Sequence, residues 1–249
     1  MQPVRIVGSY LSPYVRKVLV VLNIKGVSYR IDPIVPFFGG DEFARLSPLR
    51  RIPVFIDDHT TLCDSTVICE YLEERYPEPS VMPGQAHDRA RLRWLEEFAD
   101  TRMGEVFIWR YFNELVIRRA VWGEVPDAAI VGKATAEEIP SILDYLETQV
   151  PDHGFLAGAA LSVADIAIGA MFRNAGFARF ATDATRWPRT AAYVDAVLST
   201  SPFRALAPLE EVLMTTPIGN SRAALLERGA PLTDETLGTS SPRRGVMTI

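Results

Sequence analysis

The chain has 249 residues, of which 48% are apolar and 23% are charged, and its net charge at pH 7 is −5. This length allows two modest domains, and the apolar fraction is large enough for cores that need no disulfides. The acidic balance argues against a general nucleic-acid-binding surface, and no apolar run approaches the roughly 18 residues of a membrane-spanning helix.

The start of the chain and the number and spacing of its cysteines indicate the cellular compartment of the protein. Met1 leads almost directly into the strand-like run VRIVGS, without the charged start and long apolar core of a signal peptide. Cys63 and Cys69 lie six residues apart, which is typical of neither a disulfide framework nor a zinc site. We therefore expect a cytoplasmic protein without a bound metal, in which both cysteines are small buried side chains.

Short strands and helices are predicted to alternate over the first part of the chain. A buried strand over residues 4–9 is followed by Ser12 and Pro13, which favour the start of a helix. The apolar residues of this helix recur with helical spacing, and Gly26 is typical of the position just after a helix. A second strand is expected over residues 28–35.

The next segment predicts a loop, a hairpin and a helix. Residues 36–51 form the loop, with at most one helical turn, and two short strands over 53–57 and 60–63 flank a polar turn. An amphipathic helix over 65–77 ends at a proline. We assign residues 1–78 to one domain that mixes strands and helices.

The pattern changes after this helix. A linker rich in proline and small residues covers 79–85, and helical signals dominate residues 86–214. A strand–helix mixture followed by helices alone predicts an α+β domain and a separate all-α domain. Residues 215–249, which we call the C-terminal arm, are rich in Pro, Gly, Ser and Thr, with at most one short helix near residues 221–228. The composition of the arm leaves open whether it packs on the active site.

The order of these elements resembles that of the soluble glutathione S-transferases over residues 3–213. The similarity is carried by the helix SPYVRKV, the segment SPLRRIPVF, the helix DSTVICEYLEERYP and the helical marker LSVADIAIGAMF. The resemblance implies a thioredoxin-like N-terminal domain with a four-stranded mixed sheet, followed by an all-α domain with a hydrophobic acceptor site. It also implies a homodimer with glutathione as co-substrate; no metal, nucleic-acid or membrane partner is expected.

Ser12 is the candidate catalytic residue. Beside Pro13 it is first of all a helix cap, but the free N–H groups of a helix start also favour an anion. A hydroxyl that donates to a thiolate lowers the thiol pKa, and about 2 kcal/mol moves that pKa from ~8.5 to neutrality. Ser12 matches the catalytic serine of the theta, zeta and tau classes, so the resemblance implies that it stabilises the glutathione thiolate. Ser9 is an alternative hydroxyl, whereas the tyrosine of tyrosine-type relatives would stand nearer Gly8 than Tyr10.

The motif RRIPVF matches a glutathione-binding segment of this family. The resemblance implies a cis peptide bond before Pro53 and main-chain pairing of Ile52 with the cysteinyl part of glutathione. Arg51 matches a family lysine and would bind the glycyl end, although surface arginines are usually only solvated. Arg50 stands where the family often has glycine, a departure that would crowd the glycyl end.

Asp64 and Ser65 stand at the start of the helix over 65–77. Both residue types cap helices, and an acid followed by a hydroxyl at a helix start also suits an amino-acid head group. The resemblance implies that the helix N–H groups and Ser65 bind the carboxylate of the γ-glutamyl part, while Asp64 binds its ammonium group. Many relatives have Glu in place of this Asp.

An aromatic set is expected to line the pocket for the second substrate. Aromatic stripes on helices are usually core, but the segment TRMGEVFIWRYF matches the helix that walls this pocket in the family. An apolar pocket suits a small hydrophobic electrophile, whereas Arg110 or Arg173 would favour an acidic one. The candidate acceptor-pocket residues are Tyr10, Phe37, Phe38, Met103, Phe107 and Tyr111.

Three classes of function compete. The first is transfer of glutathione to an electrophile, or a related isomerase or β-etherase-type lyase reaction that uses the same thiolate. The second is a non-catalytic binding protein, which would not need to keep the serine, proline and acid–serine motifs together. The third, a thioredoxin-like oxidoreductase, is excluded because the sequence has no C-x-x-C motif. We therefore favour a glutathione S-transferase.

Overall fold

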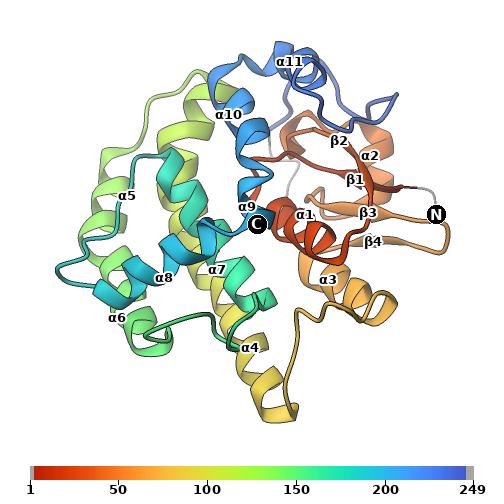
Figure 1. Ribbon diagram of the computed structural model, residues 1–249. Helices are drawn as coiled ribbons and strands as arrows, with labels where there is room; N and C mark the ends of the chain where they lie inside the picture. The colour runs from red at the N-terminus through yellow and green to blue at the C-terminus, as the bar shows by residue number, and fades with distance from the viewer. Residues whose placement is uncertain (1–2, 245–249) are drawn as a thin grey trace. The chain divides into compact units, whose positions relative to one another are not determined.

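The computed structural model describes residues 3–244, which divide into two compact units (Figure 1). The first unit contains residues 3–79 together with 205–244, and the second contains Ser80–Arg204. The first unit therefore joins the beginning of the chain to its end. No helix within the described residues is long and apolar enough to cross a membrane.

The first unit is built on a four-stranded mixed sheet with the strand order β2-β1-β3-β4. β1 pairs with β2 in parallel and with β3 in antiparallel orientation, and β3 pairs with β4 in antiparallel orientation. The predicted thioredoxin-like α+β arrangement is therefore confirmed. Its elements up to residue 79 are β1 (Val4–Val7), α1 (Pro13–Lys25), β2 (Tyr29–Asp32), η1 (Pro36–Phe38), α2 (Asp41–Leu46), β3 (Val54–Ile56), β4 (Thr61–Cys63) and α3 (Ser65–Arg75).

Helix α1 begins and ends where its sequence predicts. The Ser12 side chain caps it, Pro13 is its first residue, and Gly26 ends it with a φ of 64°. Glycine adopts this left-handed φ without the steric cost that a Cβ brings. Burial of a large aliphatic side chain contributes on the order of 1.5–3 kcal/mol, so the apolar face anchors the helix. The predicted apolar positions Val15, Val18, Leu19 and Leu22 are all fully buried.

The segment between β2 and β3 differs from the prediction in detail. β2 ends at Asp32 rather than continuing over residues 33–35, because Pro33 has no N–H to extend the ladder. The chain then makes the short 3-10 helix η1. The loop predicted over 36–51 also contains α2, which has six residues and is longer than the single turn expected.

The second unit is all-helical, which confirms the predicted class. α4 continues directly into the long helix η2, whose hydrogen bonds are of the wider i→i+5 type. α7 is buried along most of its length and forms the centre of the unit. The helices are α4 (Ala86–Phe98), η2 (Ala99–Trp122), α5 (Ala128–Lys133), η3 (Ala134–Glu138), α6 (Ile139–Gln149), α7 (Val163–Phe177), α8 (Pro188–Leu198) and α9 (Ser201–Arg204).

A buried capping box fixes the start of α7. The Ser162 N–H donates to Asp165 Oδ2 at 2.7 Å, and the Asp165 N–H donates to Ser162 Oγ at 3.4 Å. Tyr193 on α8 donates its hydroxyl hydrogen to Asp165 Oδ1 at 2.6 Å. Since buried polar groups are costly unless they are paired, this network fixes α8 against α7.

The chain after residue 204 belongs to the first unit. It contains α10 (Ala207–Thr215), η4 (Ile218–Asn220) and α11 (Ser221–Glu227), followed by an extended tail. α11 is the short helix predicted near residues 221–228. Isolated bridges join Ile31 to Leu232 and Gly39 to Gly238 in the tail after α11. In Figure 1 this dark blue tail lies beside β2 and α2. The described part of the C-terminal arm is therefore packed on the first unit.

Candidate functional site

The register of the sheet brings the predicted glutathione-binding motifs to one end of the first unit. Val7, the last residue of β1, lies opposite Val54, and Val54 lies opposite Cys63, the last residue of β4. Residues that adjoin these three in sequence must emerge from the same end of the sheet. The adjoining segments are Gly8 to Ser12, Arg51 to Pro53, and Asp64 to Ser65.

Gly8 allows a close approach at this end of the sheet. A Cβ at this position would lie 2.5 Å from Cγ2 of Val15 in α1 and 3.1 Å from Cβ of Ile52. Any side chain other than hydrogen would push both neighbours away. The absence of a Cβ therefore lets the first turn of α1 and the segment before β3 both contact the end of β1.

Ser12 lies at the N-terminus of α1 and is half-buried. Its Oγ accepts a hydrogen bond from the Val15 N–H at 3.3 Å, and its own N–H donates to the Ser9 carbonyl at 3.0 Å. Because the oxygen acts as acceptor in the cap, the hydroxyl hydrogen remains to be donated to an anion. The alternative hydroxyl, Ser9, is buried, and its Oγ accepts from the Leu11 N–H at 3.2 Å.

The segment before β3 is held by a buried serine. The Ile52–Pro53 peptide bond is cis, as the resemblance implied, and Ile52 is buried. Ser47 donates its hydroxyl hydrogen to the Arg51 carbonyl at 2.8 Å and accepts from the Arg51 N–H at 3.0 Å. Arg51 itself is exposed. Arg50, at the position that is glycine in many relatives, adopts a left-handed φ of 52° that favours glycine.

Asp64 caps α3 from a backbone conformation that is rare for a residue with a side chain. Its φ is 76° and its ψ is 130°, and Oδ1 accepts from the N–H groups of Thr66 at 2.9 Å and Val67 at 3.4 Å. Such conformations cost about 1–3 kcal/mol and gather at functional sites. The Asp64 side chain is exposed and its neighbour Ser65 is buried. The second carboxylate oxygen thus faces a position that a ligand can reach.

Lys17 is a buried cation near these helix starts that the sequence analysis did not single out. It lies on α1, is only 1% exposed, and its Nζ donates to Thr66 Oγ1 in the first turn of α3 at 3.0 Å. This bond joins the two helices whose N-termini carry Ser12 and Asp64. Lysine is almost never fully buried, so no general pattern would predict its place.

The three acceptor-pocket candidates of the first unit have different environments. Tyr10 is 1% exposed, and its hydroxyl makes no hydrogen bond within the described residues. Burial, followed by the influence of the nearby Tyr29 hydroxyl, raises the pKa of Tyr10 well above its ordinary value. Phe37 and Phe38 lie in η1, where their carbonyls accept from the N–H groups of Arg243 at 2.8 Å and Thr239 at 2.7 Å.

The other three candidates lie in the second unit, on η2. Met103 and Phe107 are fully buried, and Tyr111 is 7% exposed. The Phe107 ring packs 5.1 Å from that of Phe172 and 5.8 Å from that of Phe180. The Tyr111 hydroxyl donates to the Ala178 carbonyl at 3.2 Å, and burial raises its pKa. Their place in the acceptor pocket stays a prediction.

The two arginines considered for an acidic acceptor already have partners in the second unit. Arg110 pairs with both Glu105 and Glu138. Arg173 lies over the ring of Phe177, 4.6 Å from its centroid. The charge of Arg110 is therefore neutralised locally.

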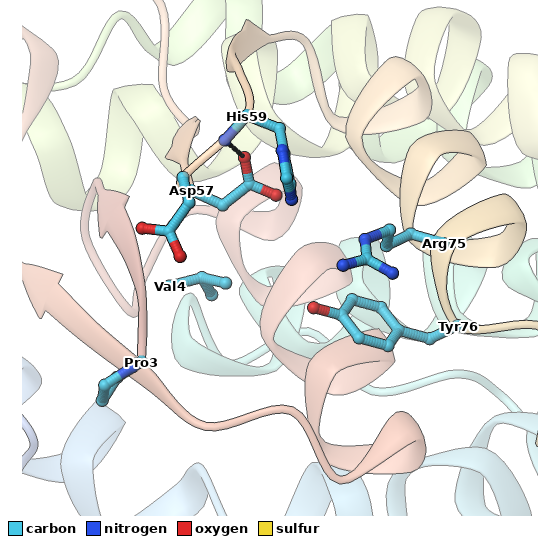
Figure 2. Close-up of a pocket in the computed structure, with 7 residues that line it drawn as sticks. Pro3, Val4, Asp57, His59, Arg75 and Tyr76 are labelled. Atoms are coloured by element: carbon cyan, nitrogen blue, oxygen red, sulfur yellow. Dashed lines mark hydrogen bonds between the residues drawn. The ribbon is translucent and has the colours of Figure 1, made fainter. Parts of the chain in front are cut away.

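A small pocket lies at the opposite end of β1 (Figure 2). Asp57 Oδ1 accepts there from the N–H groups of His59 and Thr60 at 2.8 Å, and Oδ2 accepts from the Tyr71 hydroxyl at 2.6 Å. Figure 2 shows the first of these bonds. Both carboxylate oxygens of Asp57 therefore have donors, from the turn and from Tyr71 on α3. Among residues 3–244, no three His, Cys, Asp or Glu side chains are grouped as a metal site requires.

Two family models match the chain. Residues 6–80 match the model described as "Glutathione S-transferase, N-terminal domain", and residues 128–196 match the model described as "Glutathione S-transferase, C-terminal domain". The first match covers the second half of β1, the other three strands and the three motifs at the end of the sheet. The second covers the helices from α5 to most of α8.

Curated relatives are similar over most of their length. The chain is 31% identical over 174 residues to glutathione S-transferase 3 of Zea mays, which covers 66% of this chain and 75% of that protein. It is 25% identical over 238 residues to a probable glutathione S-transferase of Nicotiana tabacum, which covers 93% of this chain and all of the relative.

Solved structures agree in fold. The crystal structure of a glutathione S-transferase from Rhodospirillum rubrum F11 has a TM-score of 0.75 and 28% identity, covering 82% of this chain and 91% of that chain. A maleylpyruvate isomerase described as a bacterial zeta-class protein has a TM-score of 0.67 and 24% identity, covering 82% and 96%. The second similarity concerns the fold alone.

Proposed function

Because this chain belongs to the glutathione S-transferase family, we propose that it activates the thiol of bound glutathione for attack on a small hydrophobic electrophile. The observation that carries the proposal is the register Val7–Val54–Cys63, from which all three motifs emerge at one end of the sheet. Two helix N-termini lie at that end, and each favours an anion through its free N–H groups.

Ser12 is the proposed catalytic residue. Its hydroxyl hydrogen is donated to the thiolate of glutathione, which stabilises the ionised form and lowers the thiol pKa. The thiol proton leaves to solvent, the thiolate sulfur forms a bond to the electrophilic carbon, and any leaving group departs with its electron pair. A hydrogen bond to a charged group and the start of α1 together supply the ~2 kcal/mol that a neutral thiol pKa requires.

Glutathione is proposed to bind along the three motifs. The main chain of Ile52 pairs with the cysteinyl part, and Arg51 binds the glycyl carboxylate. The carboxylate of the γ-glutamyl part accepts from the start of α3 and from Ser65, while Asp64 binds the ammonium group. The unused carboxylate oxygen of Asp64 and the Ser47 bonds that hold residue 51 support this arrangement.

The remaining parts of the proposal rest on the family and on composition. The electrophile is apolar, since aromatic residues dominate the candidate acceptor set. The working form is a cytoplasmic homodimer, as in the family the chain resembles. Glutathione is the only co-substrate the proposed reaction needs.

Difference absorbance of the glutathione thiolate across pH tests the proposal. The wild-type protein should bind glutathione with a thiol pKa well below the free value, and Ser12→Ala should still bind it with the pKa restored. Ser12→Ala also removes a helix cap, at a cost of about 1 kcal/mol. Asp127→Ala is the matched control, because Asp127 caps α5 through the N–H groups of Ala129 and Ile130, in the second unit.

The control separates capping from catalysis. Asp127→Ala should lose similar stability and leave the thiol pKa where the wild type has it. A wild-type protein that binds no glutathione, or binds it with an unshifted thiol, would refute the catalytic proposal and favour a binding protein on this fold.

A further inference from the structure

The C-terminal arm pairs with the free edge of the sheet at Ile31. The Ile31 N–H in β2 donates to the Pro231 carbonyl at 2.8 Å, and the Thr233 N–H donates back to the Ile31 carbonyl at 3.0 Å. Unpaired groups on an edge strand otherwise need water or a partner chain. The arm therefore supplies main-chain partners to β2 that the N-terminal segment of the unit lacks.

A buried carboxylate ties the arm to the end of β2. Asp32 is fully buried, its Oδ2 accepts from the Leu237 N–H at 2.6 Å, and its Oδ1 accepts from Nη1 of Arg222 at 3.2 Å. Arg222 also donates to the Thr233 carbonyl. Since a buried charge without partners is strongly unfavourable, these bonds hold the arm in one place.

Beyond this anchor the arm holds the loop between β2 and α2. The Gly40 N–H donates to the Leu237 carbonyl at 2.8 Å. The Arg243 side chain makes two hydrogen bonds to this part of the chain. Its Nη1 donates to Asp41 Oδ1 at 2.9 Å, and its Nη2 donates to the Gly39 carbonyl at 3.0 Å. With the bonds to the carbonyls of Phe37 and Phe38, these contacts hold residues 37–41.

Two sets of contacts connect Arg243 to the proposed glutathione site, one between charged groups and one through packing. Through charge, Asp41 lies 3.8 Å from Nη2 of Arg50. Through packing, a Cβ at Gly39 would lie 2.1 Å from the ring of Phe43, so the loop lies directly on that buried ring. The Phe43 carbonyl accepts from the Ser47 N–H at 2.8 Å, and Ser47 in turn holds the main chain of residue 51.

We infer that Arg243 is a positioning residue for glutathione binding, which acts through Asp41 and the loop before α2 to hold Arg51 and Ile52. The inference rests on the proposed function, because Arg51 and Ile52 are proposed glutathione contacts. It assigns to the arm a role in binding the co-substrate rather than in the chemical step. Loss of Arg243 then weakens glutathione binding and leaves turnover at saturating glutathione unchanged.

The test compares Arg243→Ala, Arg243→Lys and Arg30→Ala in the full-length protein. Arg30 is the matched control, because its Nη1 also forms a 2.9 Å exposed ion pair with the arm, at Asp234, but does not touch the loop. Glutathione affinity is measured by calorimetry, and KM and kcat by transfer to a chromogenic aryl halide. Melting temperatures establish that all variants are folded.

Arg243→Ala should raise the Kd and KM for glutathione by up to about fivefold, the upper limit expected when an exposed ion pair is lost. Arg243→Lys should recover part of the affinity, since it restores the charge beside Asp41 but not the second donor to Gly39. Arg30→Ala should bind glutathione like the wild type.

Four results would overturn the inference. Wild-type affinity in Arg243→Ala, or an equal loss in Arg30→Ala, would leave the arm a structural element only and would leave the proposed function standing. A fall in kcat with unchanged KM would place the effect in the chemical step. If the wild-type protein itself binds no glutathione, the proposed function fails first and the inference fails with it.

Discussion

Glu210 on α10 accepts a hydrogen bond from Nε of Arg16 on α1, and both side chains are almost completely buried. Arg16 also donates from Nη2 to the Tyr10 carbonyl at 3.2 Å, and its N–H donates to the Ser12 carbonyl at 2.9 Å. A residue near the end of the chain therefore neutralises a charge one turn after the proposed catalytic serine.

Glu210→Gln is expected to destabilise the first unit strongly. The substitution removes the negative charge of Glu210 from a buried ion pair, and loss of one partner of such a pair typically costs about 3–5 kcal/mol. Urea unfolding should show a large fall in midpoint. Asp234→Asn is the control, since its exposed ion pair with Arg30 is worth at most about 1 kcal/mol. Equal and small effects in both variants would contradict the assigned importance of the buried pair.

Asp64→Asn should separate glutathione binding from helix capping. Asparagine caps helices well and tolerates a positive φ, so the stability of α3 should change little. The ammonium group of glutathione loses its ionised partner, and charge-assisted hydrogen bonds are worth about 1.5–3 kcal/mol, so the Kd should rise roughly tenfold or more. Asp127→Asn makes the same change at the cap of α5 and should leave the Kd unaltered. A wild-type Kd in Asp64→Asn would remove Asp64 from the proposed site.

Tyr10→Phe addresses the other hydroxyl near the start of α1. The Tyr10 hydroxyl is buried beside the Tyr29 hydroxyl and makes no hydrogen bond of normal geometry within the described residues, so its burial carries a desolvation cost that is not fully offset. Removal of the hydroxyl should leave the free energy of unfolding unchanged or raise it by up to about 1 kcal/mol. The thiol pKa of bound glutathione should stay at the wild-type value. A thiol pKa that rises toward the free value would instead make this a tyrosine-type site.

Local features of the first unit were predictable because each depends on neighbours in sequence. The start and end of α1 follow from Ser12, Pro13 and Gly26, whose capping preferences act within one turn. The hairpin over 53–63 follows from two short apolar runs around a polar turn, and β3 and β4 lie inside the predicted limits. The family resemblance implied a four-stranded mixed sheet and one glutathione site for the three motifs, but the strand order β2-β1-β3-β4 came only from the structure, since no local pattern encodes sheet order.

The packing of the arm could not be predicted, because its partners lie far away in sequence. The Leu237 N–H that donates to Asp32 comes from 205 residues along the chain, and the Arg222 side chain that also donates to Asp32 comes from 190 residues away. Composition marked the arm as rich in turn-forming residues, which is also the signature of an unpacked tail. The buried Asp32 carboxylate, which needs outside donors, and the free main-chain groups of Ile31 explain why the arm packs there.

The last prediction concerns Glu147, a carboxylate on α6 that caps the start of α8. Its Oε1 accepts from the Arg189 N–H at 2.9 Å, and its Oε2 accepts from the N–H and hydroxyl of Thr190 at 2.9 and 2.7 Å. Partial burial alone would raise the pKa of Glu147, but the donors from Thr190 and Arg189 outweigh it and hold the pKa below its ordinary value.

A carboxyl group whose pKa is lower in the folded state stabilises the fold above its unfolded pKa, and this stabilisation disappears as the pH falls through the folded pKa. Glu147→Gln should therefore cost about 1 kcal/mol at pH 7, the usual value of a helix cap, and much less below pH ~4. Urea unfolding at several pH values measures the difference. Glu97→Gln is the control, because Glu97 is exposed on α4 and its side chain has no partner among the described residues. The stabilisation from a charge-dependent cap must disappear as the carboxylate is protonated. If Glu147→Gln lowers the free energy of unfolding equally at pH 7 and pH ~3.5, the side chain therefore acts through packing.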